Sequence, residues 1–522
     1  MRCSGAKVFA VAFLLLAFLA SGGGLRVWAQ GPTAEPETVL LHPDGVVNVQ
    51  DLPRVGPRVP VHREMPFLVP DLQELRDTKA QHSAARTQPA PTASATVTAA
   101  GLTTPSTTTG FIGLRRSESG GWIPPDTQVA VGFDHVVEAV NLEGRIWSKT
   151  RDLVRTFDLN SFFQTSAQLS DPKIRFDAAS QRWFIAVISY NTSFTAGAWR
   201  LAVSTSPDPT STFLRYTAAT SKSAPDFPAL GINDDKVVLT ANAFRGNSFL
   251  GTEFLVIKKA DLVSGSSAAS SYFPPPQGLF TIQPAQSLSS TCSGSVCTLY
   301  MAAVAYNSAT SIRVWSVTGV PGVGAGPTVS TVNFSLLSPL TSPPDAKQLG
   351  TSTLIQTNDN RLLDAAYRDG KLWVSAGSAC TPSGDTSTRA CLRLIQFATS
   401  SGISKSQDFD FGQTGLYYYY PAISIDGGGN LISVFSGSSA GLFAGVYASG
   451  RRSTDVANSF QSPVLIKDGE NSYTPFANRW GDYSGAAMDP SNSGIVWVAG
   501  EYARIEGGSE WGTWIAPLQM SP

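Results

Sequence analysis

The sequence predicts an all-β protein built as a β-propeller, and three observations support this fold class. Glycine and proline are abundant, with 47 and 34 copies in 522 residues, which indicates many turns between short elements. The apolar segments between these turns favour Val, Ile, Phe, Tyr and Trp, the residues enriched in strands. One unit also recurs along the chain: a polar start, an apolar strand, an Asp/Asn/Gly turn and a second apolar strand. Small repeated meanders at intervals of roughly 45 to 80 residues are typical of propeller blades.

Seven such units follow one another after residue 110. They begin with "PPDTQVAVGFDHVVEAVN" (Pro124), "DPKIRFDAASQRWFIAVIS" (Asp171), "DFPALGINDDKVVLTAN" (Asp226), "AQSLSSTCSGSVCTLYMAAVA" (Ala285), "NRLLDAAYRDGKLWVSAG" (Asn360), "YPAISIDGGGNLISVFS" (Tyr420) and "WGDYSGAAMDPSNSGIVWVAG" (Trp480). The repeat predicts seven blades, with six or eight as alternatives because the region 283–360 is long and irregular. We expect "TGFIGLRR" (109–116) to supply an edge strand that closes the ring.

The first 29 residues have the features of a signal peptide. Arg2 and Lys7 precede an apolar run over residues 8–20, which is short for a membrane span, and small residues allow cleavage near Ala29. No later stretch is long and apolar enough to cross a bilayer. We therefore predict export, with the mature protein secreted, periplasmic or at the cell surface.

Residues 30–110 differ in composition from the repeats. Residues 86–110 are rich in Pro, Thr and Ala, and a short helix is expected near Leu72. The sequence predicts a flexible N-terminal segment, either a surface spacer or a pro-segment, followed by a propeller domain over 111–522.

The mature chain contains four cysteines in two close pairs. Cys292 and Cys297, like Cys380 and Cys391, flank Ser/Gly-rich loops between apolar runs, which favours two local disulfides in an exported protein. A zinc site would need further ligands, and the histidines lie far from these pairs in the sequence; they are His42, His62, His82 and His135. No metal site is predicted from the cysteines.

Charge and histidine content exclude several function classes. A formal net charge of −1 without a basic cluster argues against nucleic acid as the partner. His135 is the one histidine within the repeats, so it would have to serve every histidine-dependent step of a catalytic triad. We interpret His135 as a packed residue at the start of a strand.

The candidate site lies where the first strands of the units begin, because these strands start on one face and surround the channel mouth. The predicted mouth residues are Asp126, Asp171, Asp226, Arg361, Tyr420, Arg479 and Asp482. Such carboxylates and arginines could bind a sugar acid or perform paired-carboxylate catalysis, and several carboxylates could hold Ca²⁺. No other cofactor is expected. The structural alternative is that each Asp accepts backbone N–H bonds and fixes a turn.

Several motifs together resemble a known family. "IPPDTQVAVGFDHVVEAVN", "DPKIRFDAASQRWFIAV", "DFPALGINDDKVVLTAN" and "RWGDYSGAAMDP" resemble exported bacterial β-propeller proteins of largely undefined function. The resemblance covers residues 110–522 and implies the fold and export, but no catalytic residues. A looser similarity is to sialidases with Asp-boxes: "SIDGGGNL" (424–431) shares the Ser, Asp and first Gly, but has Leu431 where Trp belongs.

Two functions remain open from the sequence. The first is a monomeric exported binding module for a glycan or an extracellular protein. The alternative is a carbohydrate-active enzyme, a sialidase-like glycoside hydrolase or a polysaccharide lyase, in which Arg361 or Arg479 holds an acidic sugar. Two carboxylates about 5 to 10 Å apart and open to a pocket would favour the hydrolase. A plugged mouth would favour the binding module.

Overall fold

The computed structural model describes residues 36–56, 61–84, 96–97, 105–107, 109–220, 223–275, 279–476 and 478–520. The predicted signal peptide and the Pro/Thr/Ala-rich stretch lie almost entirely outside these ranges. Among the described residues the helices are short: η1 (Val49–Asp51), α1 (Leu72–Ala84), α2 (Leu159–Phe163) and α3 (Lys259–Ser264). None of the helices in this part of the chain is both long and apolar enough to cross a membrane.

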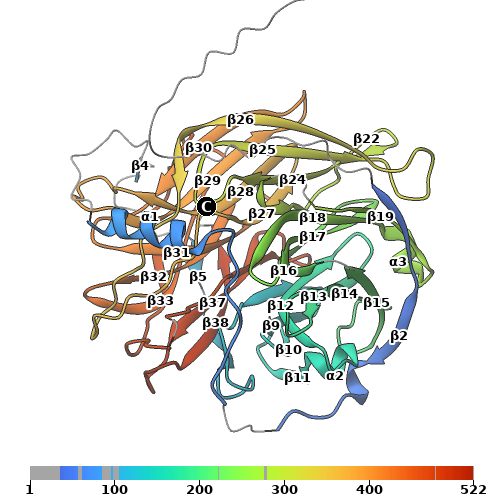
Figure 1. Ribbon diagram of the computed structural model, residues 1–522, viewed down its shortest axis with the longest axis horizontal. Helices are drawn as coiled ribbons and strands as arrows, with labels where there is room; N and C mark the ends of the chain where they lie inside the picture. Colours follow the sequence, from blue (N-terminus) through green and yellow to red (C-terminus); the bar gives the residue numbers. More distant parts are fainter. Residues whose placement is uncertain are drawn as a thin grey trace, which may run out of the picture.

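The strands form consecutive antiparallel sets, each starting with an inner strand (Figure 1). The first three sets are β8 (Gln128–Val131), β9 (His135–Val140), β10 (Glu143–Ser148) and β11 (Leu153–Asp158); β12 (Gln168–Asp177), β13 (Arg182–Tyr190), β14 (Gly197–Ser204) and β15 (Thr212–Thr220); and β16 (Ala224–Ile232), β17 (Lys236–Arg245), β18 (Ser248–Lys258) and β19 (Ala268–Phe273). The next two are β20 (Phe280–Pro284), β24 (Leu299–Val304), β25 (Ser308–Thr318) and β26 (Thr328–Thr341); and β27 (Leu362–Arg368), β28 (Lys371–Cys380), β29 (Arg389–Ala398) and β30 (Ser404–Phe411). The last two are β31 (Tyr417–Ile425), β32 (Leu431–Ser439), β33 (Leu442–Arg451) and β35 (Val464–Lys467); and β36 (Gly485–Met488), β37 (Ile495–Ala503) and β38 (Trp511–Gln519).

The prediction of a propeller is confirmed, but the structure has five separate blades and not seven. Five sheets of four or five strands stand alone. The remaining two sets, which begin with β16 and β27, form a single ten-stranded sheet because the short strand β21 (Gln286–Ser287) pairs in parallel with both. The repeat pattern predicts separate sheets for these two sets, but the two-residue β21 pairs with both and joins them.

The ring closes through an N-terminal strand. Each inner strand contacts the next, and β36 contacts β8. Strand β6 (Phe111–Arg115) pairs antiparallel with β38, so the predicted edge strand at 109–116 is confirmed. Strand β5 (Ser106–Thr107) also pairs with β38. The start of the propeller thereby covers the edge of its last blade.

The recurrent Asp/Pro sequences place a bulge at the start of several inner strands. The ladders shift register after Ser170, Asp226 and Tyr419. At each shift a residue with positive φ precedes a proline: Asp171 (φ 56°), Phe227 (φ 51°) and Tyr420 (φ 57°). Proline has no N–H to donate, so it fits a position where the ladder is interrupted.

Parts of segment 30–110, which the sequence predicts to be flexible, pair with strands of the propeller. Strand β1 (Glu37–Leu41) pairs with β19, and β2 (Pro43–Asn48) pairs with β15. Strand β3 (Arg63–Glu64) pairs in parallel with β7 (Trp122–Ile123), and β4 (Thr96–Val97) with β34 (Ser459–Phe460). The alternating apolar residues of 37–49 form strands that cover the outer edges of two blades. The helix expected near Leu72 is present as α1.

Tryptophans on second strands pack between blades. Trp183, Trp373 and Trp497 are 0%, 1% and 4% exposed. Trp183 lies in one apolar cluster with Ala130 and Val137 of the preceding blade. These side chains therefore hold neighbouring sheets together.

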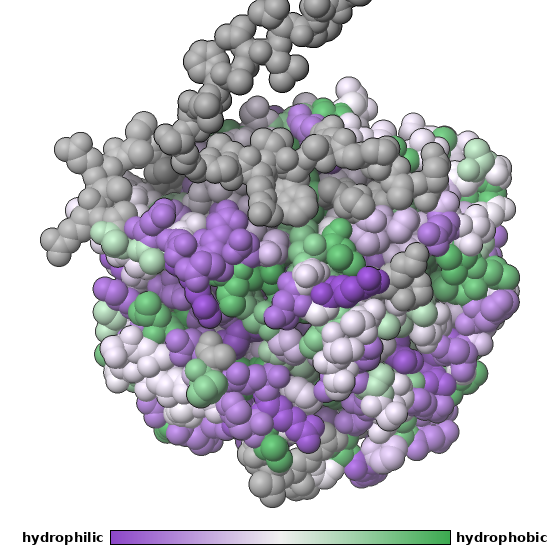
Figure 2. Space-filling view, in the orientation of Figure 1, coloured by the Kyte–Doolittle hydropathy of each residue, from purple (hydrophilic) through white to green (hydrophobic). Residues whose placement is uncertain are grey.

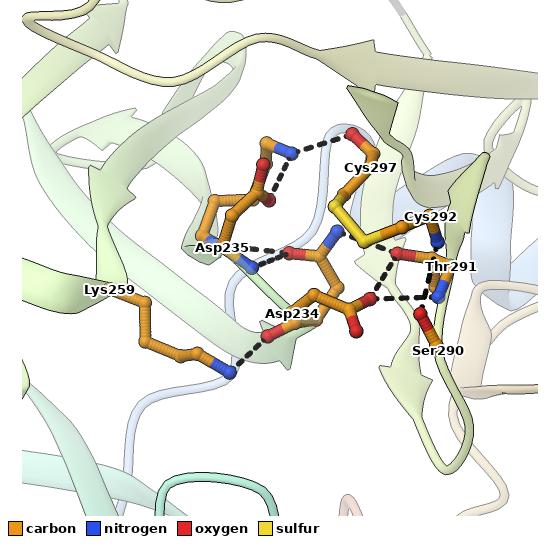
Figure 3. Close-up of a disulfide and its surroundings, with 9 residues drawn as sticks. Asp234, Asp235, Lys259, Ser290, Thr291, Cys292 and Cys297 are labelled. Carbon is orange, nitrogen blue, oxygen red and sulfur yellow. Dashed lines mark hydrogen bonds and ion pairs between the residues drawn. A yellow bond between two sulfur atoms is a disulfide. The ribbon is translucent and has the colours of Figure 1, made fainter. Parts of the chain in front are cut away.

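Both predicted disulfides are present. Cys292 bonds to Cys297 across the hairpin of β22 (Cys292–Ser293) and β23 (Val296–Cys297), and Cys380 bonds to Cys391. Asp234 accepts hydrogen bonds of 2.7 Å from the N–H and the hydroxyl of Thr291, which ties the first hairpin to the β16–β17 turn (Figure 3).

Candidate functional site

A small pocket lies where the inner strands begin, at the predicted mouth of the channel. Its cavity volume is about 10 Å³, which is close to the room that one water molecule requires. The lining residues are Met65, Pro66, Phe67, Leu68, Ser170, Asp171, Tyr190, Phe194, Pro225, Asp226, Phe227, Asn358, Arg361 and Asp482. Four of the seven predicted mouth residues therefore line one pocket, and Asp126 and Arg479 bond to Asp482 in its wall.

Asp126 is a buried structural carboxylate. Its Oδ1 accepts the backbone N–H of Asp482 at 3.1 Å, and its Oδ2 accepts the side-chain amide of Asn141 at 2.6 Å. The Asn141 oxygen in turn accepts the N–H of Asp171 at 2.9 Å. Burial, followed by the charges of Asp482 and Asp171, raises the pKa of Asp126 well above its usual range. Asp126 thus links the last blade to the first two.

Asp171 connects the next pair of inner strands while still facing the pocket. Its Oδ2 accepts the N–H of Phe227 at 3.2 Å and the hydroxyl of Tyr483 at 3.4 Å. Only one of its two carboxylate oxygens is engaged by these bonds. Asp171 is therefore both a link between blades and a wall of the pocket.

The two mouth arginines are already paired. Arg361 forms a two-pronged ion pair with Asp359, with distances of 2.8 and 2.7 Å, and its guanidinium lies over the rings of Phe227 and Phe280. Arg479 donates to Asp482 at 2.7 Å. Both guanidiniums are fixed in orientation by these carboxylates.

Tyr420 and Asp482 complete the back of the site. The Tyr420 hydroxyl donates to the carbonyl of Gln356 at 3.0 Å, so its ring is fixed in the core and does not line the pocket. Asp482 also accepts the side-chain amide of Asn358 at 2.9 Å. Arg479 and Asn358 each donate to one carboxylate oxygen of Asp482, so both oxygens have a partner.

Asp226 differs from the other predicted carboxylates. Its side chain is partly exposed and lines the pocket, and within the described part of the chain no donor forms a hydrogen bond to its carboxylate. Burial in the pocket wall, followed by the charge of Asp171, raises its pKa well above the usual range, while Arg361 opposes this shift. The carboxylate of Asp226 is therefore the acceptor most available to a ligand.

Sequence reasoning missed the residues that cover and back the mouth. Met65 to Leu68 come from the segment that was predicted to be flexible; the apolar run "MPFLV" was the available signal. Tyr190, the last residue of β13, and Phe194, just after it, stack with ring centroids 4.8 Å apart on the pocket wall. These positions follow from tertiary contacts, which a repeat pattern does not encode.

Glu501, on the second strand β37 of the last blade, is a further acid outside the predicted set of mouth residues. It is 2% exposed, and neither carboxylate oxygen has a hydrogen-bond partner among the described residues. Burial, followed by the charges of Asp126 and Asp482, raises its pKa well above the usual range. It is a buried acid next to the mouth cluster.

Among the described residues, few side chains are placed close enough together to bind a metal ion. The one set of three ligand atoms lying within 4.8 Å of each other is Asp234 with Cys292 and Cys297. Those sulfurs are bonded to each other, so they do not offer thiolates (Figure 3). The mouth carboxylates do not form such a set.

Comparisons with known proteins return distant likenesses in fold. No family model matches the sequence, and no curated protein matches it. A protein of unknown function from Dyadobacter fermentans aligns over 80% of this chain and 100% of its own, with 9% identity and a TM-score of 0.37. The GH93 alpha-L-arabinofuranosidase of Fusarium graminearum with arabinobiose aligns over 76% and 93%, with 7% identity and a TM-score of 0.37. A Hadza microbial sialidase aligns over 74% and 73%, with 10% identity and a TM-score of 0.33. At these TM-scores the likenesses say nothing about this chain's activity.

Proposed function

We propose that this protein is an exported β-propeller that binds a glycan at the channel mouth. The single observation that carries the proposal is Asp226, a partly exposed carboxylate that faces the pocket without a hydrogen-bond donor among the described residues. Sugar hydroxyls are the donors that such a carboxylate would accept. The stacked rings of Tyr190 and Phe194 beside it offer an apolar face for a sugar ring.

The visible surface favours a glycan over a large protein partner. In Figure 2, hydrophilic and hydrophobic residues are interspersed wherever side chains are coloured, without one broad apolar patch. Large apolar patches are what protein-binding surfaces commonly present. The two disulfides suit an exported location.

A glycoside hydrolase is the second candidate, and one observation favours it. The charge of Asp171 raises the pKa of Asp226, and both carboxyl groups line the same pocket. A carboxyl group with a raised pKa beside a second one is what a general acid in such a pair requires. In this alternative Asp226 is the general acid and Asp171 is the base or nucleophile.

A glycan array and an assay for released reducing ends, both on the full chain, test the proposal. The variant is Asp226→Asn, and the matched control is Asp369→Asn in an exposed turn on the far side of the inner strands. We expect binding to fall at least about tenfold in D226N, equivalent to about 1.4 kcal/mol, and to persist in D369N. Turnover that falls by about 10² or more in D226N would assign the hydrolase. Equal binding by D226N and the parent protein would refute the mouth as the ligand site.

We also propose that the ten-stranded sheet acts as two blades around the channel, giving seven units about the axis. The shared strand β21 contributes two residues, whereas each joined set has four strands of its own. Hydrogen exchange in which the β16 and β27 sets open independently would support this description.

A further inference from the structure

One stretch of the N-terminal segment lies across the candidate site. We call residues 61–84 the strap. In Figure 1 the blue N-terminal chain runs along the outer edge at β2, and α1 lies on the propeller face in front of the strands. Between these two elements, Met65 to Leu68 form part of the pocket wall. The strap therefore occupies the volume through which a ligand would approach Asp226.

At the mouth the strap contacts a predicted mouth arginine and a tyrosine of the pocket wall. Arg479 donates to the carbonyl of Pro66 at 3.4 Å, and its guanidinium lies 4.9 Å from the ring centroid of Phe67. The Tyr190 hydroxyl lies 3.7 Å from the sulfur of Met65. An arginine and a tyrosine in the mouth thus make polar contacts with the chain's own peptide.

The strap is held firmly at its two ends. Near its start, the N–H of Met65 donates to the carbonyl of Ile123 at 2.7 Å beside the β3–β7 pairing. At its end, the buried Lys79 of α1 donates to the carbonyl of Pro343, to Asp345 and to Thr357, at 3.0, 2.7 and 3.0 Å. Between these anchors, the hydrogen bond described for Pro66 and Phe67 is the one from Arg479 to the Pro66 carbonyl, at 3.4 Å.

This distribution of contacts is the one expected of a lid. Upstream, β1 and β2 belong to blades, so the chain remains attached to the propeller when the strap lifts. Met65, Leu68 and Val69 are 5%, 9% and 6% exposed and belong with the anchors, whereas Pro66 is exposed and Phe67 is partly exposed. Segments with few buried contacts open at low free-energy cost while their anchors stay in place.

We propose that the strap is an autoinhibitory lid that keeps the mouth closed until it is displaced. The identity of the incoming ligand rests on the proposed function, but the closure itself does not. The present cavity holds about one water molecule, so a sugar requires the exposed Pro66 and the partly exposed Phe67 to move.

Carboxyl labelling measures the closure without any ligand. The full chain is treated with a water-soluble carbodiimide and glycine ethyl ester, and the modification rate at Asp226 is read by peptide mass spectrometry. The test variants are M65A/F67A, which loosens the strap over the mouth, and K79M, which loosens it at α1. The matched control is V61A, because Val61 is 54% exposed and does not line the pocket.

We expect Asp226 to be modified at least about tenfold faster in M65A/F67A and in K79M than in the parent protein, and unchanged in V61A, since a tenfold shift in opening corresponds to about 1.4 kcal/mol. The buried Glu253 of β18, in the same blade as Asp226, reports unfolding of that blade and should stay protected. Unchanged labelling of Asp226 would overturn the proposal. Parallel increases at Asp226 and Glu253 would overturn it too, because the segment would then be part of the core and not a lid.

These outcomes are separable from those of the glycan assays. Faster labelling of Asp226 with no glycan bound by any variant would retain the lid and reject the glycan. Binding by the parent protein that equals that of M65A/F67A would reject the lid and retain the glycan site.

Discussion

Aspartates at equivalent positions of the repeat have different roles in the folded protein. Asp126 accepts bonds from Asn141 and from the backbone of Asp482, whereas Asp226 accepts none from the described residues. The sequence predicted both as mouth residues, because both stand next to a proline at the start of a strand. Neighbouring side chains and backbone groups from other blades decide which carboxylate accepts hydrogen bonds. A local sequence pattern does not contain that information.

This difference predicts unequal effects of alanine substitution on stability. D126A leaves a buried N–H and a buried amide unsatisfied, so we expect a loss of about 2 to 4 kcal/mol. D226A removes a group without such partners and should cost less than about 1 kcal/mol. Denaturant unfolding of the two variants in parallel is the measurement. Equal losses would mean that Asp226 is also structural.

Glu138 makes a second residue-scale prediction, about pH. Its carboxylate is fully buried and accepts the Thr513 hydroxyl, and burial raises its pKa to about 7 from 4.5. Below pH 4.5 the group is protonated in both states. Between pH 4.5 and about 7 the unfolded chain ionises while the folded chain keeps its proton, so stability falls through this window.

Glu138→Gln stays neutral and should lose this component of the pH dependence. The stability of E138Q relative to the parent should increase by on the order of 3 kcal/mol between pH 4.5 and 7.5, since each pKa unit corresponds to about 1.4 kcal/mol. Thermal unfolding across this pH range checks the slope. A constant difference between the two proteins would contradict the assignment.

At the scale of elements, strand positions were largely predictable and their partners were not. The period-2 apolar runs and Asp/Asn/Gly turns identified the first and second strands, including the cysteine hairpins. The two-residue β21 merges two sets into one sheet, and β1 and β2 occupy edges of blades that begin more than a hundred residues later. These strands pair with the blade edges that are still unpaired in the assembled ring. Which edges those are depends on the whole fold and not on the local sequence.

The two disulfides should contribute unequally. Cys380–Cys391 spans 11 residues and Cys292–Cys297 spans 5. The loop-entropy relation gives about 3 kcal/mol for the longer loop and about 2 for the shorter. C380S/C391S should therefore lower the melting temperature more than C292S/C297S, as calorimetry of the two double variants would show. The reverse order would indicate that native-state contacts outweigh loop entropy.

At the scale of the whole molecule, the ring depends on a seam between residues far apart in the sequence. Leu114 of β6 is fully buried, and its N–H donates to the Thr513 hydroxyl of β38 at 2.7 Å. The closing strand was predicted from its position before the first unit and from the need to cover an open edge. The sequence did not predict that the strap covers the mouth, because the apolar run of the strap is short and lies among polar residues.

Leu114→Ala should weaken this seam. We expect a loss of about 2 to 5 kcal/mol and faster hydrogen exchange in β38 than in β32, which lies away from the seam. Leu250→Ala, at a site 36% exposed, is the control and should change neither quantity much. Uniform exchange across all blades in L114A would show that the ring opens everywhere at once.

The central claim is that Asp226 at the mouth contacts the ligand, and a protection experiment tests it most directly. The glycan that scores highest on the array is added to the strap-loosened M65A/F67A protein before carbodiimide labelling. Our account predicts that modification of Asp226 slows in proportion to glycan occupancy, while the exposed Asp369 labels at an unchanged rate. Saturating glycan that leaves labelling of Asp226 unaltered would contradict it.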